Sequence, residues 1–293
     1  MPELPEVEVT RRQVRPLLVG RRIAAVHTTR PSYFFVTPPA TLRRRLAGRT
    51  ATEVERHGKY LLAALDDGSR LLLHLGMTGQ LFGAGARSVR LLSSTGGGTL
   101  SPEDQVEARG PDRHVHLRLA FEDGGRDLLF RDTRKFGKVA WLAPGRSDPR
   151  LDRLGPDALG ADGLLLWAAS RRRSAPVKTL LLDQGVLAGV GNIYADEALF
   201  GAGVRPTRAA RRLTRAECER LAEEIRRVLL RSIETGGSSI SDYVHPDGTD
   251  GGYQDERRVY ARTGERCLRC GDGAIARRVI GGRSSHFCPR CQR

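Results

Sequence analysis

The sequence has no long apolar run, no apolar segment at its start and no acidic tail. A membrane-spanning helix needs about 20 predominantly apolar residues, so the first absence argues against an integral membrane protein. The second argues against a secretory signal and leads us to expect a cytoplasmic protein. Because no acidic tail offsets them, 49 lysines and arginines outweigh 34 acidic residues and give a net charge of +15. A chain of this charge is expected to bind a polyanion.

Lysine is also scarce, since most of the basic residues are arginines. The lysines are Lys59, Lys135, Lys138 and Lys178, and each is a weak candidate for a position that requires an ammonium group.

The sequence contains five cysteines. One, Cys218, lies inside a helical pattern and is expected to be a core residue. The others form two C-x-x-C pairs that residues 271–287 separate, a spacing that allows four thiolates to bind one zinc ion with no ligand position left for catalysis. The alternative, two disulfides or a redox dithiol, is disfavoured by a reducing cytoplasm. The predicted ligands of this structural zinc ion are Cys267, Cys270, Cys288 and Cys291.

The first six residues can place a reactive amine beside two carboxylates. If Met1 is removed, Pro2 carries a terminal secondary amine, and α-amino groups titrate at about 7.7–8.0. Such an amine can attack an aldehyde-like carbon, while Glu3 and Glu6 move protons. The alternative is purely structural, with Pro5 at the first position of a helix whose positive end acidic residues stabilise.

Hydrophobic periodicity divides the chain into a β-rich part and a helical part. An amphipathic helix is predicted over residues 5–18. Strand patterns follow at residues 23–29, 60–65, 70–75, 114–121 and 128–141, with hairpin turns at Asp67-Gly68 and Asp123-Gly124-Gly125. Repeated hairpins of this kind predict a β-sandwich. The clearest later helix begins at a capping box of Thr214 and Glu217 and ends at Gly236-Gly237.

Composition gives the expected domain boundaries. We predict an N-terminal domain at residues 1–143, a linker at 144–158, a helical domain at 159–253 and a zinc finger at 254–293. A stretch rich in glycine and serine at residues 83–110 is predicted to be a surface insertion in the first domain. The fold class expected is α+β with two domains, a β-sandwich with a flanking helix and a helical domain that carries the zinc finger.

The chain resembles the formamidopyrimidine-DNA glycosylase family, bacterial enzymes that excise oxidised purines such as 8-oxoguanine. The resemblance rests on the zinc cysteines and on five earlier motifs in order, MPELPEVE at 1–8, HGKYLL at 57–62, HLGMTG at 74–79, RDTRKFG at 131–137 and GVGNIY at 189–194. It implies an N-terminal β-sandwich and a C-terminal domain with a helix-two-turn-helix motif and a zinc-finger β-hairpin.

The resemblance also implies roles for the candidate catalytic residues. Pro2 would attack the anomeric carbon of the damaged nucleotide, and Glu3 would protonate the sugar ring. Glu6 would support this end of the chain. Lys59 and Arg283 match residues that the family assigns to the β- and δ-elimination steps. Because an arginine pKa exceeds 12, Arg283 is expected to act mainly by charge and geometry.

Seven residues are implied to contact DNA. Met77, Arg134 and Phe136 match a trio that fills the void left when the damaged base rotates out of the duplex. Taken singly, Met77 and Phe136 would be typical core residues. The implied contacts to the DNA backbone come from His114, Arg173, Lys178 and Asn192.

The implied activity is that of a bifunctional glycosylase and abasic-site lyase. It would act on damaged double-stranded DNA as a monomer in the bacterial cytoplasm, associated with the nucleoid, with no redox or nucleotide cofactor. Two alternatives remain: an endonuclease VIII-like glycosylase for oxidised pyrimidines, and a zinc-ribbon DNA-binding protein without chemistry. In the predicted lesion-capping segment, Gly251-Gly252-Tyr253 has glycine where many family members have an aromatic residue, so the sequence leaves the preferred lesion open.

Overall fold

The computed structural model describes residues 2–86, 112–239 and 249–293. They form two compact units, which we call the N-terminal unit (Met1–Asp148 with Gly236–Gly252) and the C-terminal unit (Pro149–Thr235 with Tyr253–Arg293). The described part of Gly236–Gly252 thus groups with the N-terminal unit, although the sequence placed it in the helical domain. Three features named above lie outside the described residues: Met1, most of the insertion, and residues 240–248 of the lesion-capping segment.

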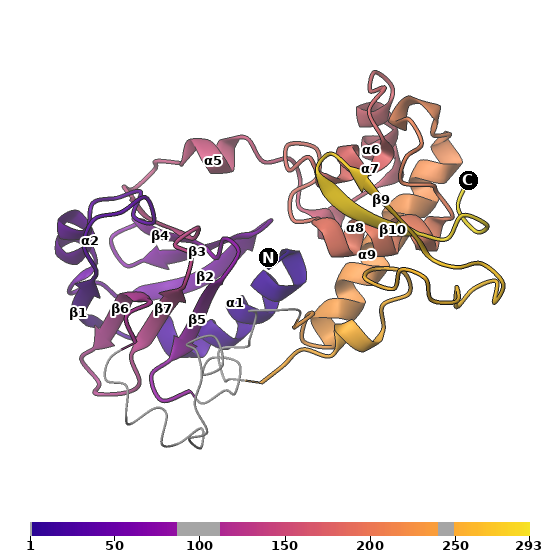
Figure 1. The fold of residues 1–293 in the computed structure, drawn as a ribbon. Helices are drawn as coiled ribbons and strands as arrows, with labels where there is room; N and C mark the ends of the chain where they lie inside the picture. The colour runs from indigo at the N-terminus through magenta and orange to yellow at the C-terminus, as the bar shows by residue number, and fades with distance from the viewer. Residues whose placement is uncertain (1, 87–111, 240–248) are drawn as a thin grey trace, which may run out of the picture. The chain divides into compact units, whose positions relative to one another are not determined.

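The N-terminal unit contains two four-stranded antiparallel sheets (Figure 1). Their strand orders are β2-β3-β4-β8 and β1-β6-β7-β5. The elements are α1 (Leu4–Leu18), β1 (Ile23–Thr28), α2 (Pro39–Leu46), β2 (Ala51–His57), β3 (Tyr60–Leu65), β4 (Arg70–His74), β5 (Gly79–Gly83), β6 (Val115–Phe121), β7 (Leu128–Asp132) and β8 (Lys138–Leu142).

Both sheets and α1 contribute side chains to one hydrophobic core. Val7 and Val14 of α1, Leu61 of β3 and Phe130 of β7 are members of the same buried cluster. Packing one face of each sheet against a shared core is the arrangement of a sandwich. The predicted sandwich with a flanking helix is therefore confirmed, as are both predicted hairpins.

The strand predicted over residues 128–141 is wrong, because the chain leaves one sheet and enters the other within it. β7 pairs with β5 and β6, whereas β8 pairs with β4. Between them, Lys135 has a φ of 58°, and the Asp132 carboxylate accepts hydrogen bonds from the N–H groups of Arg134 and Gly137. These contacts bend the loop, so alternation alone could not define the strand. The sequence also missed α2, β2 and β5.

The C-terminal unit is helical and ends in a β-hairpin (Figure 1). Its elements are α5 (Pro149–Asp152), η1 (Ala158–Gly160), α6 (Gly163–Ser170), α7 (Val177–Leu182), α8 (Asn192–Ala202), η2 (Ala210–Arg212), α9 (Arg215–Glu234), η3 (Tyr253–Asp255), β9 (Ala276–Ile280) and β10 (Arg283–Phe287). The capping box of Thr214 and Glu217 begins α9 as predicted. Cys218 is buried, and burial raises the pKa of its thiol to about 11, which agrees with a core residue. Among the described residues, no helix is both long enough and apolar enough to cross a membrane.

A buried carboxylate ties α1 to the turn between β2 and β3. Glu8 accepts hydrogen bonds from Arg11 and Arg12 on its own helix and from Arg56 on β2, whose Nε lies 3.2 Å from Oε2. Arg56 also donates to the carbonyl of Gly58 at 3.0 Å. Burial opposes ionisation of Glu8, but the hydrogen bonds of Arg11 and Arg12 outweigh it and lower the pKa to about 2.

We expect Glu8 to stabilise the fold above pH 4.5 and to lose this contribution as the pH falls toward 2. The folded-state pKa lies below the ordinary value of 4.5, so the folded state releases this proton more readily than the unfolded chain does. The shift corresponds to at most about 3 kcal/mol of unfolding free energy. Urea unfolding of the Glu8→Gln variant across this pH range should show a shallower loss of stability than the wild type.

The matched control is Glu53→Gln, because Glu53 pairs with Arg15 at the surface, where both side chains are largely exposed. Surface pairs contribute little, so this variant should follow the wild-type pH profile closely. A Glu8→Gln profile with the wild-type slope would contradict the prediction.

Candidate functional site

The predicted catalytic carboxylates lie at the buried start of α1. Glu3 is the N-cap residue and forms a capping box with Glu6. The N–H of Glu3 donates to Oε2 of Glu6 at 2.8 Å, and Oε1 of Glu6 accepts a hydrogen bond from the N–H of Ser238, also at 2.8 Å. Pro2 is buried directly before them. Glu6 therefore joins the first residues of the chain to the start of the Gly236–Gly252 segment.

Two glycines allow this segment to approach so closely. Gly237 has a φ of 82°, and a Cβ there would lie 3.1 Å from Oε1 of Glu6. A Cβ on Gly251 would lie 2.2 Å from the carbonyl oxygen of Gly237, so a side chain at 251 would force the backbone apart. Gly251 thus has a packing role in this chain.

Lys59 lies in the turn between β2 and β3, where its side chain is buried. Gly58 before it has a φ of 54°, a conformation that glycine adopts without strain. Through Arg56, the Glu8 network holds this turn against α1, the helix that begins directly after Glu3. The structure therefore places Lys59 and the two candidate carboxylates on parts of the N-terminal unit that the ion pair between Arg56 and Glu8 holds together.

Met77 and Phe136 are exposed, unlike core residues. Their exposed fractions are 39% and 40%, and Arg134 is exposed as well. The loops that carry them touch through their backbones, since a Cβ on Gly76 would lie 2.5 Å from the backbone of Phe136. The guanidinium of Arg134 lies 4.6 Å from the centre of the Phe136 ring. The core interpretation of Met77 and Phe136 is wrong, and the predicted trio forms one exposed cluster.

Asp132 holds these two loops together and was missed by the sequence analysis. Its side chain is fully buried. One oxygen accepts a hydrogen bond from Oγ1 of Thr78 at 2.5 Å and another from the N–H of Arg134 at 3.2 Å, and the other oxygen accepts from the N–H of Gly137 at 2.7 Å. A buried carboxylate with three donors is well satisfied. In the sequence, Asp132 was an acid inside a predicted strand and a member of the motif at 131–137, and neither feature indicated which backbone groups it would bind.

Arg283 lies at the tip of the C-terminal hairpin. It is exposed and is the first residue of β10, directly after Gly281-Gly282. Both glycines have positive φ, as a two-residue type I′ turn requires. Neither Arg283 nor Arg134 has an acidic partner within the described parts of the chain, so both guanidinium groups are available to an anionic ligand.

The other predicted cations are already paired. Arg173 donates to Asp183 at 2.7 Å, with both side chains about 40% exposed. Lys178 has no exposed surface; its Nζ lies 2.7 Å from Oδ1 of Asp196, which is equally buried, and donates to the carbonyl of Ser284 at 2.8 Å. A phosphate contact by Lys178 would require this buried pair to open, and that contact stays a prediction.

Asn192 begins α8, where the glycine before it, Gly191, provides no side-chain cap. The preceding loop is braced by Gln184, which accepts from the N–H of Gly189 and donates to the carbonyl of Val190. The first N–H groups of a helix favour anions, so this helix start is suited to a phosphate.

His114 is half-buried before β6, and the carboxylate of Asp112 accepts a hydrogen bond from its N–H at 2.8 Å. Burial lowers the pKa of its imidazole, more strongly than the neighbouring Asp112 raises it. Asp112 also pairs with the buried guanidinium of Arg131. His114 is therefore expected to be neutral at pH 7 and to contact a phosphate by hydrogen bonding alone.

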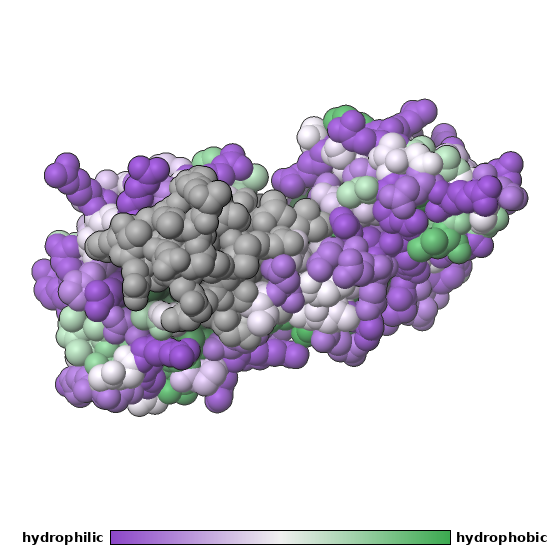
Figure 2. Space-filling model, turned by 60° about the horizontal axis from the view of Figure 1, so that its bottom comes forward, coloured by the Kyte–Doolittle hydropathy of each residue, from purple (hydrophilic) through white to green (hydrophobic). Residues whose placement is uncertain are grey.

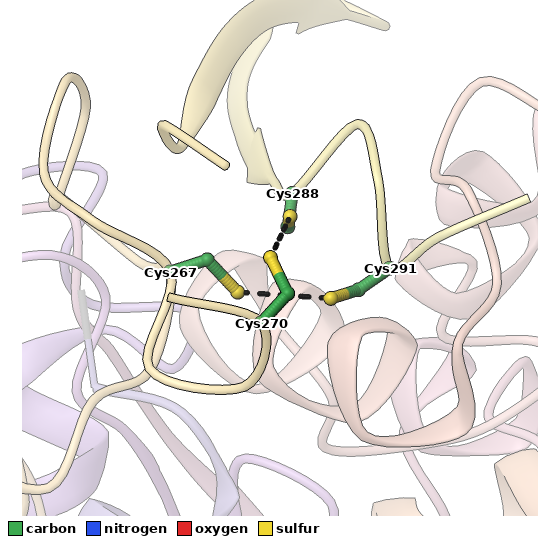
Figure 3. Close-up of side chains that lie close together, drawn as sticks. All are labelled: Cys267, Cys270, Cys288 and Cys291. Carbon is green, nitrogen blue, oxygen red and sulfur yellow. Dashed lines mark hydrogen bonds between the residues drawn. The ribbon is translucent and has the colours of Figure 1, made fainter. Parts of the chain in front are cut away.

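The four predicted metal ligands converge (Figure 3). Their sulfur atoms all lie within 4.8 Å of one another, and the distances from Cys267 to Cys291 and from Cys270 to Cys288 are 3.7 and 3.8 Å. Zinc–sulfur bonds of about 2.3 Å in a tetrahedron place sulfur atoms roughly 3.8 Å apart. The four sulfur atoms fit zinc and are far too separated for disulfides, which confirms the structural zinc site over the disulfide alternative.

Backbone geometry supports this cluster. The N–H of Gly273 lowers the pKa of Cys270 to about 7, whereas burial raises the pKa of Cys288 and of Cys291 while no metal is bound. A bound zinc ion would favour the thiolate form of all four ligands. A Cβ on Gly273 would lie 3.0 Å from the sulfur of Cys288. Gln292 accepts a hydrogen bond from the N–H of Cys288 and donates to the carbonyl of Val204, so the cluster is anchored to the segment that follows α8.

Much of the surface visible in Figure 2 is hydrophilic, with only scattered hydrophobic side chains. Together with the net charge of +15, such a surface is typical of a protein that binds a polyanion.

Comparison with known proteins gives consistent matches along the chain. Residues 1–139 match the formamidopyrimidine-DNA glycosylase N-terminal domain, residues 154–244 its H2TH domain, and residues 264–293 a zinc finger found in FPG and IleRS. A formamidopyrimidine-DNA glycosylase of Thioalkalivibrio sulfidiphilus is 42% identical over 296 residues, with both chains fully covered.

Solved structures agree. The crystal structure of the MutM (FPG) protein from Thermus thermophilus superposes with a TM-score of 0.82 at 40% identity, covering 99% of this chain and 98% of that one. A Lactococcus lactis FPG mutant, solved in complex with DNA that contains Fapy-dG, has a TM-score of 0.83 at 32% identity, with both chains fully covered.

We expect Asp196→Asn to destabilise the C-terminal unit by about 3–5 kcal/mol, because it removes the negative charge 2.7 Å from the buried ammonium of Lys178. The double variant Lys178→Met/Asp196→Leu removes both charges and should recover much of this loss. Urea unfolding of the three proteins tests the prediction. Equal stability of Asp196→Asn and the wild type would contradict it.

Removal of zinc is expected to loosen residues 264–293 and to leave the N-terminal unit folded, because the hydrophobic core of that unit contains none of the four cysteines. Hydrogen exchange with and without a chelator measures this, with faster exchange expected in the zinc finger alone. Cys218→Ala is the control and should retain one equivalent of zinc. Exchange that rises equally throughout the chain would contradict the prediction.

Proposed function

The chain belongs to the formamidopyrimidine-DNA glycosylase family, and from this we propose that it is a base-excision repair enzyme that removes oxidised purines from double-stranded DNA. The enzyme is a DNA glycosylase and abasic-site lyase with one structural zinc ion. The observation that carries the proposal is the buried start of α1, where Pro2 precedes two carboxylates held by a capping box and by Ser238.

In the first step, we assign nucleophilic attack to Pro2 and proton transfer to Glu3. With Met1 removed, the lone pair of the Pro2 nitrogen forms a bond to the anomeric carbon. The bond from that carbon to the base breaks, and the base leaves with the bonding electrons and takes up a proton. Glu3 protonates the sugar ring oxygen, so the ring opens and a cationic imine remains. Glu6 does not enter the reaction but fixes Glu3 through its backbone N–H.

The imine then permits strand cleavage. Its positive charge withdraws electrons from the adjacent carbon, which makes the proton there acidic, and successive β- and δ-eliminations expel the phosphates on either side. We assign support of these steps to Lys59 and Arg283. Arg283 stabilises a leaving phosphate by charge and by hydrogen bonds, since its guanidinium stays protonated throughout.

Base rotation out of the duplex leaves a gap and costs a few kcal/mol. We assign the filling of this gap to the exposed cluster of Met77, Arg134 and Phe136. The apolar side chain and the ring replace lost stacking, while the guanidinium of Arg134 meets the orphaned base. Support comes from their common exposure on two interlocked loops.

Contacts to the DNA backbone are assigned to Asn192 at the start of α8, to Arg173 and to His114, with Lys178 as the least accessible of the predicted contacts.

A bacterial cytoplasmic location, with association to the nucleoid through DNA, is part of the proposal. Support comes from the relatives that match over the full length, which are bacterial.

Two other functions would fit parts of this structure. A glycosylase for oxidised pyrimidines would use the same nucleophile, and excision assays on duplexes with single defined lesions separate it from the proposed enzyme. A zinc-ribbon DNA-binding protein without chemistry would use Glu3 and Glu6 only to cap α1 and to bind Ser238, and it would form no covalent adduct with abasic DNA.

We expect the protein to form a covalent adduct with abasic DNA in the presence of borohydride, which reduces the imine to a stable amine. Pro2→Gly and Glu3→Gln should reduce base excision by at least about 100-fold, the usual contribution of a catalytic proton donor or nucleophile, with DNA binding largely retained. Gel mobility and mass spectrometry of the adduct measure this. An adduct that maps to a lysine, or full activity in protein that retains Met1, would overturn the proposal.

A further inference from the structure

Tyr33 is an exposed aromatic residue that the mechanism above does not use. It begins the sequence Tyr33-Phe34-Phe35, between β1 and α2. Phe34 and Phe35 are buried, whereas 58% of Tyr33 is exposed. Core packing explains the two phenylalanines and leaves the exposed tyrosine unexplained.

The segment that carries Tyr33 is fixed to the sheet. The carbonyl of Phe34 accepts a hydrogen bond from the N–H of Val139 at 3.0 Å, and the N–H of Val36 donates to the carbonyl of Val139 at 2.9 Å. The Phe34 ring packs against the rings of His116 and Phe130, with centroids 5.3 and 4.9 Å away. Tyr33 therefore projects from a rigid support rather than from a free loop.

From this support, Tyr33 reaches the cluster that is assigned to the gap in the duplex. Its hydroxyl donates a hydrogen bond to the carbonyl of Arg134 at 2.7 Å. Its ring lies 6.3 Å from the ring of Phe136, and the ammonium of Lys138 lies 4.6 Å from the centre of the Tyr33 ring. Tyr33 thus contacts two residues of the loop between β7 and β8, Arg134 and Phe136, and the first residue of β8, Lys138.

The backbone of Arg134 is consequently held on both sides. Its N–H donates to Asp132 and to Thr78, each at 3.2 Å, and its C=O accepts from Tyr33. The next residue, Lys135, has a φ of 58°. This left-handed conformation is energetically unfavourable for residues other than glycine. Such a loop keeps its shape only if outside contacts define it. Asp132 and Tyr33 provide those contacts at Arg134, the residue whose guanidinium is assigned to the orphaned base.

We propose that Tyr33 is a positioning residue that aims Arg134 at the orphaned base and thereby sets the enzyme's selectivity for the base opposite the lesion. This inference rests on the proposed function, in which Arg134 meets that base. Without the hydroxyl, the Arg134 carbonyl loses its partner and the peptide can rotate. The guanidinium then samples several directions, and hydrogen bonds that distinguish one opposite base from another weaken.

The test uses Tyr33→Phe, which removes the hydroxyl and keeps the ring. Single-turnover excision is measured on four duplexes that carry 8-oxoguanine opposite each of the four bases, and strand cleavage is measured on single-stranded abasic DNA, which has no opposite base. The control is Val36→Ala, which shortens an exposed apolar side chain of the same segment.

In Tyr33→Phe, the ratio between the fastest and the slowest opposite base is expected to fall by about 3- to 10-fold, the effect of one hydrogen bond. Val36→Ala should keep the wild-type ratio. A wild-type ratio in Tyr33→Phe would overturn the inference. Equal slowing on all duplexes and on single-stranded abasic DNA would overturn it too, because it would indicate a general structural role. If the wild type itself excises nothing, the proposed function fails instead.

Discussion

Buried carboxylates that accept hydrogen bonds from backbone N–H groups hold the functional loops of this protein in place. Glu6 binds Glu3 and the start of the Gly236–Gly252 segment, Asp132 binds the loop after β7, and Glu197 binds three consecutive N–H groups that lead into the zinc finger. A buried carboxylate without donors would be costly, so each of these acids specifies one loop conformation. The start of α1, the exposed cluster of Met77, Arg134 and Phe136, and the zinc finger each depend on such an anchor.

Local signals were sufficient for much of the fold. The capping box at Thr214 and the Asp-Gly turn after β3 act within a few residues, and both predictions are confirmed. The failures involve contacts distant in sequence. β7 ends at Asp132 because the chain then crosses to the other sheet, where β8 pairs with β4. β5 is defined by its pairing with β7, a strand that lies more than 40 residues later in the sequence. Alternation of apolar side chains cannot carry that information.

The candidate site divides in the same way. The zinc cysteines were identified by residue type and spacing. The roles of Glu3 and Lys59 were implied by motifs shared with the family and stay predictions. The supporting residues were not identified. The Asp132 carboxylate and the Tyr33 hydroxyl fix loops by hydrogen bonds to backbone groups. The sequence does not indicate which backbone groups these side chains bind. Lys178 shows the converse difficulty, since a lysine expected at the DNA backbone is fully buried against an acid.

Charge pairing gives a physical way to separate structural cations from those available to DNA. Many arginines form ion pairs, as Arg173 does with Asp183, and such a cation must break its pair before it can gain from a phosphate. Arg134 and Arg283 have no acidic partner among the residues the structure describes. A guanidinium without such a partner loses no ion pair on binding, so its full attraction to DNA contributes to affinity. These two positions combine exposure, a fixed backbone and a charge without an acidic partner among the described residues, as the contacts proposed for them with an orphaned base and a leaving phosphate require.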